Sequence, residues 1–154
     1  MDDLVVVDTD AAYLPDLRID QLRPNSDGGT LGLVPSTGSD HYAVVDEAQV
    51  TTADYLQGST VGDYDLLGLP NLSVTPASIL GVNLVGFADK TDVTARSWNM
   101  GLDSGGTVSN GDDLALATAA ASYYHRLLQT DPNTAAAWLK AGVDGLQLRP
   151  RVAV

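Results

Sequence analysis

The clearest hydrophobic pattern lies in residues 76–102. From Ile79 to Ala88 apolar residues occupy both alternating sets of positions. This is typical of a strand buried on both faces, or of one that crosses from one buried face to the other. From Ser97 to Leu102 apolar and polar or small residues alternate, as in a strand with one face in water. The polar stretch 88–92 between them predicts a turn. We therefore expect these two strands to form a β-hairpin at the centre of a β-rich domain.

The segment 114–128 carries conflicting signals. Its first half is rich in Ala, which favours a helix, whereas Leu114 and Leu116 alternate with Ala, and the following residues have β character. We favour two strands joined near residues 118–120, because tertiary context overrides propensity. A further strand is expected at residues 146–154, where Pro150 cannot donate to a ladder. This strand is therefore predicted to be an edge strand or to carry a bulge.

One short helix is expected at about residues 132–142. Asp131 and Pro132 form a helix-start signal, and Gly142 provides a stop. Trp138 falls within this helix and is predicted to point into the core. Trp98, on the alternating strand, is expected to point inward as well.

These patterns predict a mainly β protein, an antiparallel β-sandwich or jelly roll with one short helix. Shorter strands are expected within residues 41–50 and 63–69. Residues 31–154 form the predicted β-sandwich domain. Residues 1–30 contain a strand-prone run followed by Pro and Gly, which indicates an extended N-terminal arm that packs on the body or on a partner. The alternative is a frayed terminus followed by an ordinary first strand.

Composition excludes several classes of function. The chain has 154 residues, a net charge of −12 and no cysteine, so it has no disulfide, thiolate metal site or cysteine nucleophile. Acids outnumber bases 20 to 8, which disfavours direct binding to nucleic acid or to anionic membranes. No apolar stretch approaches the ~20 residues of a membrane helix. The acidic N-terminus does not resemble a secretion signal, so we expect synthesis in the cytoplasm and no membrane insertion.

Candidate catalytic residues are few and scattered. His41 and His125 lie far apart in sequence, and each is expected to be a hydrogen-bonding strand residue. Ser104 is flanked by glycine in a predicted hairpin loop, with no base evidently paired with it. Asp63 and Asp65 share one face of a probable strand, but acids are common in this chain. We therefore predict that the protein is not an enzyme.

No metal or cofactor is expected either. Asn110, Asp112 and Asp113 offer hard oxygen ligands for calcium, but their spacing is not that of an EF-hand loop. No phosphate-binding or dinucleotide-binding loop occurs in the sequence.

The candidate site residues are therefore contact residues. Tyr123 and Tyr124 are neighbours on a strand, so one of them must face outward as an interface or sugar contact. Arg149 and Arg151 flank Pro150, where an exposed edge would accept a partner strand. The complete set of predicted contacts adds apolar residues of the arm and comprises Leu4, Val5, Val6, Val7, Tyr13, Leu14, Leu17, Tyr123, Tyr124, Arg149 and Arg151.

Several short strings occur in an order that resembles a known family. They are Leu22–Gly28, His41–Tyr42, Val45–Glu47, Ser59–Asp65, Val82–Lys90 with Asp92 and Arg96–Ser97, Leu102–Gly106, Gln129–Trp138 and Val143–Leu148. The most distinctive is Thr-Asp-Pro-x-Thr-x-x-x-Trp at residues 130–138. The chain resembles, over residues 17–150, a family of small virion structural proteins of tailed bacteriophages and prophages. This resemblance implies a β-sandwich particle protein and carries over no functional residues.

The resemblance implies a non-enzymatic virion structural protein on the particle exterior. It would be a capsid decoration, head spike or fibre, or a collar- or tail-associated subunit. It would dock through its N-terminal arm on other phage structural proteins, such as the major capsid, portal, tail or fibre proteins, and form a homo-oligomer. The alternative is a carbohydrate-binding receptor-recognition module of a tail fibre or spike, with a host surface glycan as its ligand.

Overall fold

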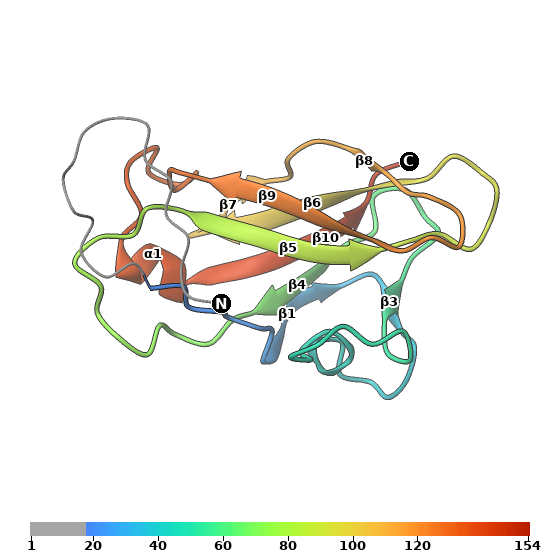
Figure 1. Cartoon of the computed structure of the whole chain (residues 1–154), viewed down its shortest axis with the longest axis horizontal. Helices are drawn as coiled ribbons and strands as arrows, with labels where there is room; N and C mark the ends of the chain where they lie inside the picture. Colours follow the sequence, from blue (N-terminus) through green and yellow to red (C-terminus); the bar gives the residue numbers. More distant parts are fainter. Residues whose placement is uncertain (1–17) are drawn as a thin grey trace.

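The computed structural model describes residues 18–154, and the chain in this range is mainly β with antiparallel sheets (Figure 1). The elements, in chain order, are β1 (Ser26–Leu31), β2 (Val34–Pro35), the 3-10 helix η1 (Tyr42–Val44), β3 (Leu56–Gln57), β4 (Asp65–Gly68), β5 (Val82–Ala88), β6 (Ser97–Ser104), β7 (Thr107–Ser109), β8 (Leu114–Ala115), β9 (Ser122–Leu128), α1 (Lys140–Asp144) and β10 (Leu146–Val152). The predicted fold class is confirmed.

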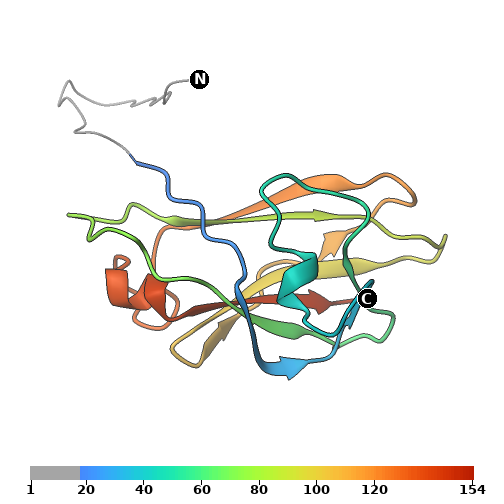
Figure 2. The same cartoon turned by 90° about the horizontal axis from the view of Figure 1, so that it is seen from below.

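The strands form two layers. The larger sheet has six strands in the order β1-β4-β10-β6-β7, and β8 also pairs with β6. The smaller sheet is the pair β5–β9, which lies over the larger sheet in both views (Figures 1 and 2). Between β2 and β3, which pair with each other, the chain carries η1 past the β1 side of the larger sheet. The result is a sandwich whose second layer is only two strands wide.

The predicted hairpin between Ile79–Ala88 and Ser97–Leu102 is wrong. β5 pairs with β9 along its whole length, from Val82↔Leu128 to Ala88↔Ser122, whereas β6 pairs with β10. The chain changes layers between β5 and β6. β5 and β6 both carry apolar side chains and pack face to face across the core. Hydrophobic periodicity does not distinguish this arrangement from edge-to-edge pairing in one sheet. The prediction that β5 is buried on both faces is also wrong, since Leu84 is buried but Val85 is 57% exposed.

The core lies between the two sheets. Its buried members are Leu84, Met100, Leu102, Trp138, Val143 and Leu146. Trp138 is 2% exposed, and its indole N–H donates to the Leu128 carbonyl over 2.9 Å. Trp98 packs against this cluster and meets the ring of Tyr124 edge-on, with 5.6 Å between ring centroids. The predicted inward orientation of both tryptophans is confirmed.

The short helix comes later than expected, at Lys140–Asp144. At the predicted helix start, Asp131 accepts the Asn133 N–H over 2.9 Å and the Ser104 hydroxyl over 2.7 Å. Ala135 has a positive φ of 55°, which interrupts a right-handed helix. A local side-chain bond and a tertiary bond therefore stabilise a turn in place of the first helical turns.

The two strands expected within residues 114–128 are confirmed as β8 and β9. The edge position expected for Pro150 is wrong, because β10 is an inner strand between β4 and β6. Pairing between β10 and β4 is present at Leu148↔Leu67 and again at Arg151↔Tyr64, so Pro150 stands in a gap between them. β10 tolerates the proline at an inner position because residue 150 has no pairing partner in β4, so no N–H donor is needed on that side.

β1 is an outer strand of the larger sheet and pairs with β4 from Ser26↔Gly68 onward. Residues 26–30, the last part of the predicted arm, therefore belong to an ordinary edge strand of the body. Residues 18–25 lead into this strand and are described without regular structure.

Gly86 packs against the Trp98 ring of the other layer, and a side chain at this position is predicted to destabilise the fold. A Cβ atom at Gly86 would lie 2.3 Å from the Trp98 ring. We expect Gly86→Ala to lower the free energy of unfolding by about 1–3 kcal/mol, as overpacking does. Urea unfolding followed by tryptophan fluorescence measures this. The matched control is Gly29→Ala, where a Cβ meets nothing within 4 Å. It should leave stability unchanged or raise it by up to about 1 kcal/mol.

Asp144 is predicted to contribute stability only above acidic pH. The Lys140 ammonium donates to the Asp144 carboxylate over 2.5 Å, and the Leu72 N–H donates to the same carboxylate over 2.8 Å. The hydrogen bond with Lys140, and then that with Leu72, lower the pKa of Asp144 below its ordinary value. A lowered pKa in the folded state stabilises the fold above the unfolded pKa of about 3.9, and this stability is lost as pH falls through the folded pKa. Asp144→Asn should therefore lower Tm at pH 7 and lower it by less at pH 2. An equal Tm loss at both values would contradict the ion-pair assignment.

Candidate interaction face

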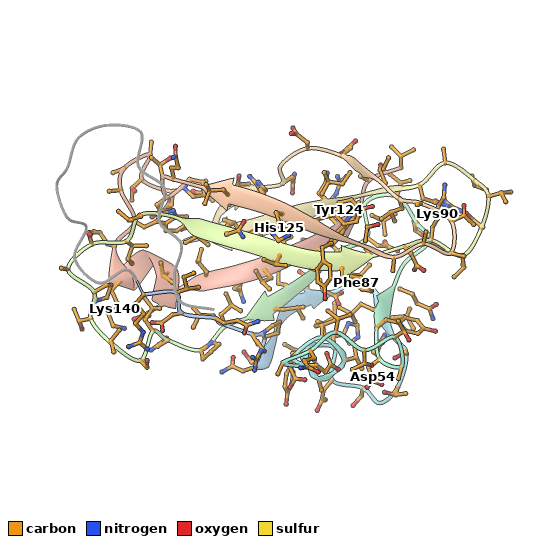
Figure 3. The ribbon with its side chains drawn as sticks, viewed as in Figure 1. Asp54, Phe87, Lys90, Tyr124, His125 and Lys140 are labelled. Atoms are coloured by element: carbon orange, nitrogen blue, oxygen red, sulfur yellow. The ribbon has the colours of Figure 1, made fainter. Side chains whose placement is uncertain are left out.

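The smaller sheet presents one row of side chains away from the larger sheet. Three cross-strand pairs form it: Asn83↔Leu127, Val85↔His125 and Phe87↔Tyr123. We call these six residues the outer face. The alternation of β5 and β9 places them together, because residues two apart in a strand share a face. Figure 3 labels Phe87 and His125 on these two strands.

The outer face is largely apolar and carries no carboxylate, lysine or arginine. Val85, Tyr123 and Leu127 are 57%, 59% and 64% exposed. The Phe87 and Tyr123 rings pack at 4.8 Å between centroids with an interplanar angle of 55°. In a chain of net charge −12, a fully exposed sheet face would ordinarily be charged or polar. The outer face is therefore an uncharged and largely apolar patch on an acidic chain.

The polar members lie at the centre and at one end of the outer face. The side-chain nitrogens Asn83 Nδ2 and His125 Nδ1 are 3.5 Å apart, and both residues are exposed. They give a partner two hydrogen-bonding groups beside the exposed apolar side chains. An apolar patch with a few polar groups is the usual composition of a recognition surface.

The inner side of the same two strands is held firmly. The Tyr124 hydroxyl donates to the Ala115 carbonyl over 3.0 Å. Arg126 donates to the carbonyls of Met100 and Ser109, each over 2.8 Å. Burial lowers the pKa of Arg126, and the nearby charge of Asp112 opposes this shift. These contacts keep β9 in place, so the outer face is preorganised.

Of the two neighbouring tyrosines, Tyr123 faces outward and Tyr124 packs inward on Trp98. Sequence reasoning found Tyr123 but missed Val85, Phe87 and Leu127. The alternation of residues along β5 and β9 did contain this information. The predicted hairpin, however, paired β5 with β6, so the side chains of β5 and β9 were not seen as one face. The arm residues predicted as contacts, Leu4, Val5, Val6, Val7, Tyr13, Leu14 and Leu17, lie outside the described residues.

Arg149 and Arg151 lie in β10, on the side of the larger sheet that faces away from the core. The Arg149 guanidinium lies 3.8 Å from the centroid of the Tyr64 ring. Arg151 Nη1 donates to Asn99 Oδ1 over 3.0 Å. A hydrogen bond with Thr30, and then one with Arg149, lower the pKa of Tyr64 below its ordinary value. The structure therefore places both arginines in contacts within the chain, and it does not bring them near Tyr123.

One buried carboxylate–histidine pair was not anticipated. His41 Nδ1 and Asp65 Oδ2 are 2.7 Å apart, and both residues are buried. The other oxygen of Asp65 accepts the N–H groups of Gly32 and Leu33, each over 2.8 Å. Asp27 accepts the His41 N–H over 3.1 Å. These bonds fasten the segment after β1 to β4, which is a structural role.

Ser104 is also occupied by a structural bond. Its hydroxyl donates to Asp131, and both residues are buried. Among residues 18–154, neither His41 nor His125 hydrogen bonds to Ser104. The hydroxyl therefore holds the turn at Asp131 against the end of β6.

The oxygen ligands considered for calcium are likewise engaged. Asn99 Nδ2 donates to the Asp112 carbonyl over 3.0 Å and to Asp113 Oδ1 over 2.6 Å. The Asn110 side chain accepts a hydrogen bond from Arg149. Within the described part of the chain, no group of three or more His, Asp or Glu side chains is placed to hold a metal ion. In the same range no helix has the length and apolar character needed to cross a membrane.

Comparisons with protein-family models, with curated proteins and with solved structures found no match to this chain.

The buried Asp65 is predicted to be essential for stability. Asp65→Ala would leave two backbone N–H groups and His41 without their acceptor. A buried donor left unsatisfied costs about 1–3 kcal/mol. We expect the free energy of unfolding to fall by about 3 kcal/mol or more, measured by urea denaturation. Asp46→Ala, at an exposed carboxylate, is the control and should change stability by no more than about 0.5 kcal/mol. Equal effects of the two substitutions would show that the buried pair does not hold the segment.

Proposed function

We propose that this protein is a non-enzymatic structural subunit on the exterior of a bacteriophage particle, which docks on another structural protein. The observation that carries the proposal is the exposed, uncharged outer face on an otherwise acidic chain. Contiguous apolar patches on soluble proteins commonly mark interaction sites. The proposed particle is a bacteriophage because several strings of the sequence resemble those of phage virion proteins.

The charge distribution favours a protein partner. A chain of net charge −12 repels phosphate backbones, which disfavours nucleic acid as the ligand. The outer face, which has no carboxylates, is a place where a second protein can approach without burying unpaired charge. Capsid, portal, tail or fibre proteins, and further copies of the chain, are partners of this kind.

The outer face is too small to be the whole contact. Two strands about 5 Å apart and three residue pairs long cover roughly 200–300 Å², whereas a stable interface needs about 800 Å² per partner. Docking therefore requires further surface, and the N-terminal segment is the second contact that the sequence predicts. In this proposal Val85, Tyr123 and Leu127 form the part of the interface that the smaller sheet contributes.

Particle incorporation tests the proposal. A phage genome that carries this coding sequence would be grown with the double variant Val85→Lys/Leu127→Lys, and purified particles would be assayed by mass spectrometry. Two buried charges should reduce incorporation at least about tenfold. The control is Val50→Lys/Val61→Lys, which alters two exposed valines outside the outer face and should incorporate normally. Absence of the unaltered protein from purified particles would overturn the proposal, and equal incorporation of both variants would remove the outer face from it.

A second candidate function is recognition of a host surface glycan through the same face. The observation that favours it is the exposed Tyr123 ring beside Phe87, with the polar groups of His125 and Asn83 close by. An exposed aromatic ring offers an apolar surface on which a sugar can stack. A glycan array distinguishes the two candidates. Binding that Tyr123→Ala abolishes would support receptor recognition, and an array without hits would eliminate it.

A further inference from the structure

β9 has an open edge. Within residues 18–154 it pairs only with β5, so the backbone groups on its other side have no strand partner. The strand is seven residues long and regular. Proteins usually cover or interrupt a long exposed edge, because it is a template for pairing with another segment. This edge is therefore a site at which a further strand would fit.

A trough runs along the same edge. One depression, with a volume of about 370 Å³, lies between β9 and the loop before β8 and is lined by Met100, Gly111, Asp112, Leu114, His125, Arg126 and Leu127. A second, more open depression of about 650 Å³ continues past the end of β9 and is lined by Ser109, Leu127, Leu128, Gln129, Thr130 and Pro132. Leu127 belongs to both, so the two depressions adjoin. A strand edge beside a trough is the arrangement that binds an extended segment by strand addition.

The lining of the trough indicates what kind of segment fits. Met100, Leu114 and Leu128 are apolar, and Arg126 is already committed to the Met100 and Ser109 carbonyls. Alternate side chains of an added strand would point toward this lining, and the others would extend the outer face beside Leu127. The segment should therefore be apolar at consecutive positions.

We propose that Leu4–Val7 of the same chain adds to the open edge of β9 as a third strand of the smaller sheet. These four residues are consecutively apolar, and three are valine, which favours strands. Asp residues stand on both sides of the run, at positions 3 and 8, and limit the apolar segment to four residues. The proposal goes beyond the particle function and is tested without it. An added strand would extend the outer face, so the segment would meet a partner as part of that face.

The tether is long enough to reach the edge of β9 from residues 18–25, which lie on the β5 side of the pair (Figure 1). Arg18 is held by a hydrogen bond of 3.3 Å to Ser73, and Figure 2 shows the described chain entering on the side of the smaller sheet that faces away from the larger one. Residues 8–17 span up to about 33–36 Å when extended. The smaller sheet is two strands wide, about 10 Å, so the segment can cross it.

The tether also decides which copy supplies the strand. A short covalent link gives an effective concentration in the millimolar range, far above that of a dilute second copy. The segment therefore occupies the edge of its own chain in dilute solution. A strand exchanged between two copies is the competing arrangement, and the experiment must separate the two.

Disulfide trapping tests the proposal directly, because the native chain has no cysteine. The full chain would carry Leu127→Cys with either Val5→Cys or Val6→Cys, since a shift of one residue in register exchanges the two faces. The control pairs the same N-terminal cysteines with Val50→Cys, an exposed valine on the loop before β3. Under mild oxidation at micromolar protein, we expect one Leu127 pair to form an intrachain disulfide at least tenfold faster than its control. Equal rates, or disulfide-linked dimers alone, would overturn the proposal.

Hydrogen exchange provides a second measurement without cysteines. The full-chain variant Val5→Asp/Val6→Asp should release the strand, and amides in residues 122–129 should exchange at least tenfold faster. The matched control, Ala11→Asp/Ala12→Asp, adds the same charge to the tether and should leave exchange in β9 unchanged. Exchange that is unaffected in both variants, or accelerated equally in both, would overturn the proposal.

Discussion

The structure depends on the close contact between the two sheets at Gly86 and Trp98. The Trp98 ring occupies the space that a Cβ atom at position 86 would need, so the layers approach more closely there than two side chains would allow. The Tyr124 hydroxyl donates to the Ala115 carbonyl, and the Trp138 indole N–H donates to the Leu128 carbonyl. Three aromatic side chains and one missing side chain thus help to set the position of the smaller sheet. A sheet of only two strands is marginal by itself and needs such packing to persist.

That dependence explains the division of chemistry across β5 and β9. The inner side chains are committed to the core and to carbonyls of the larger sheet, and Arg126 is the clearest example. Within residues 18–154 no second layer covers the outer side chains, yet most of them are apolar. The open edge of β9 has the same character, since apolar side chains line the trough beside it. Within residues 18–154, one face and one edge of the smaller sheet therefore remain without a covering element on this side.

Two buried aspartates of the described chain, Asp65 and Asp131, serve as acceptors for backbone and side-chain donors. Asp65 accepts from two backbone N–H groups and from His41, and Asp131 accepts from Ser104 and from Asn133. Each holds an irregular segment against a strand of the larger sheet. A buried carboxylate that accepts several hydrogen bonds fixes a loop much as a cap fixes a helix end. The acidic composition therefore reflects how the loops are held as well as the charge of the surface.

The sequence by itself determined the fold class, the inward position of Trp98 and Trp138, the two strands in residues 114–128 and the outward orientation of one of two tyrosines. These features follow from alternation and composition, which are local. Only the tertiary structure decided that β5 pairs with β9 and not with β6, that β10 is an inner strand, and that Asp131 begins a turn. Strand pairing and side-chain acceptors join residues far apart in the chain, and no local pattern encodes the choice among equally apolar strands. The outer face depends on the pairing of β5 with β9, because Val85, Phe87 and Leu127 form one surface only when these two strands lie side by side.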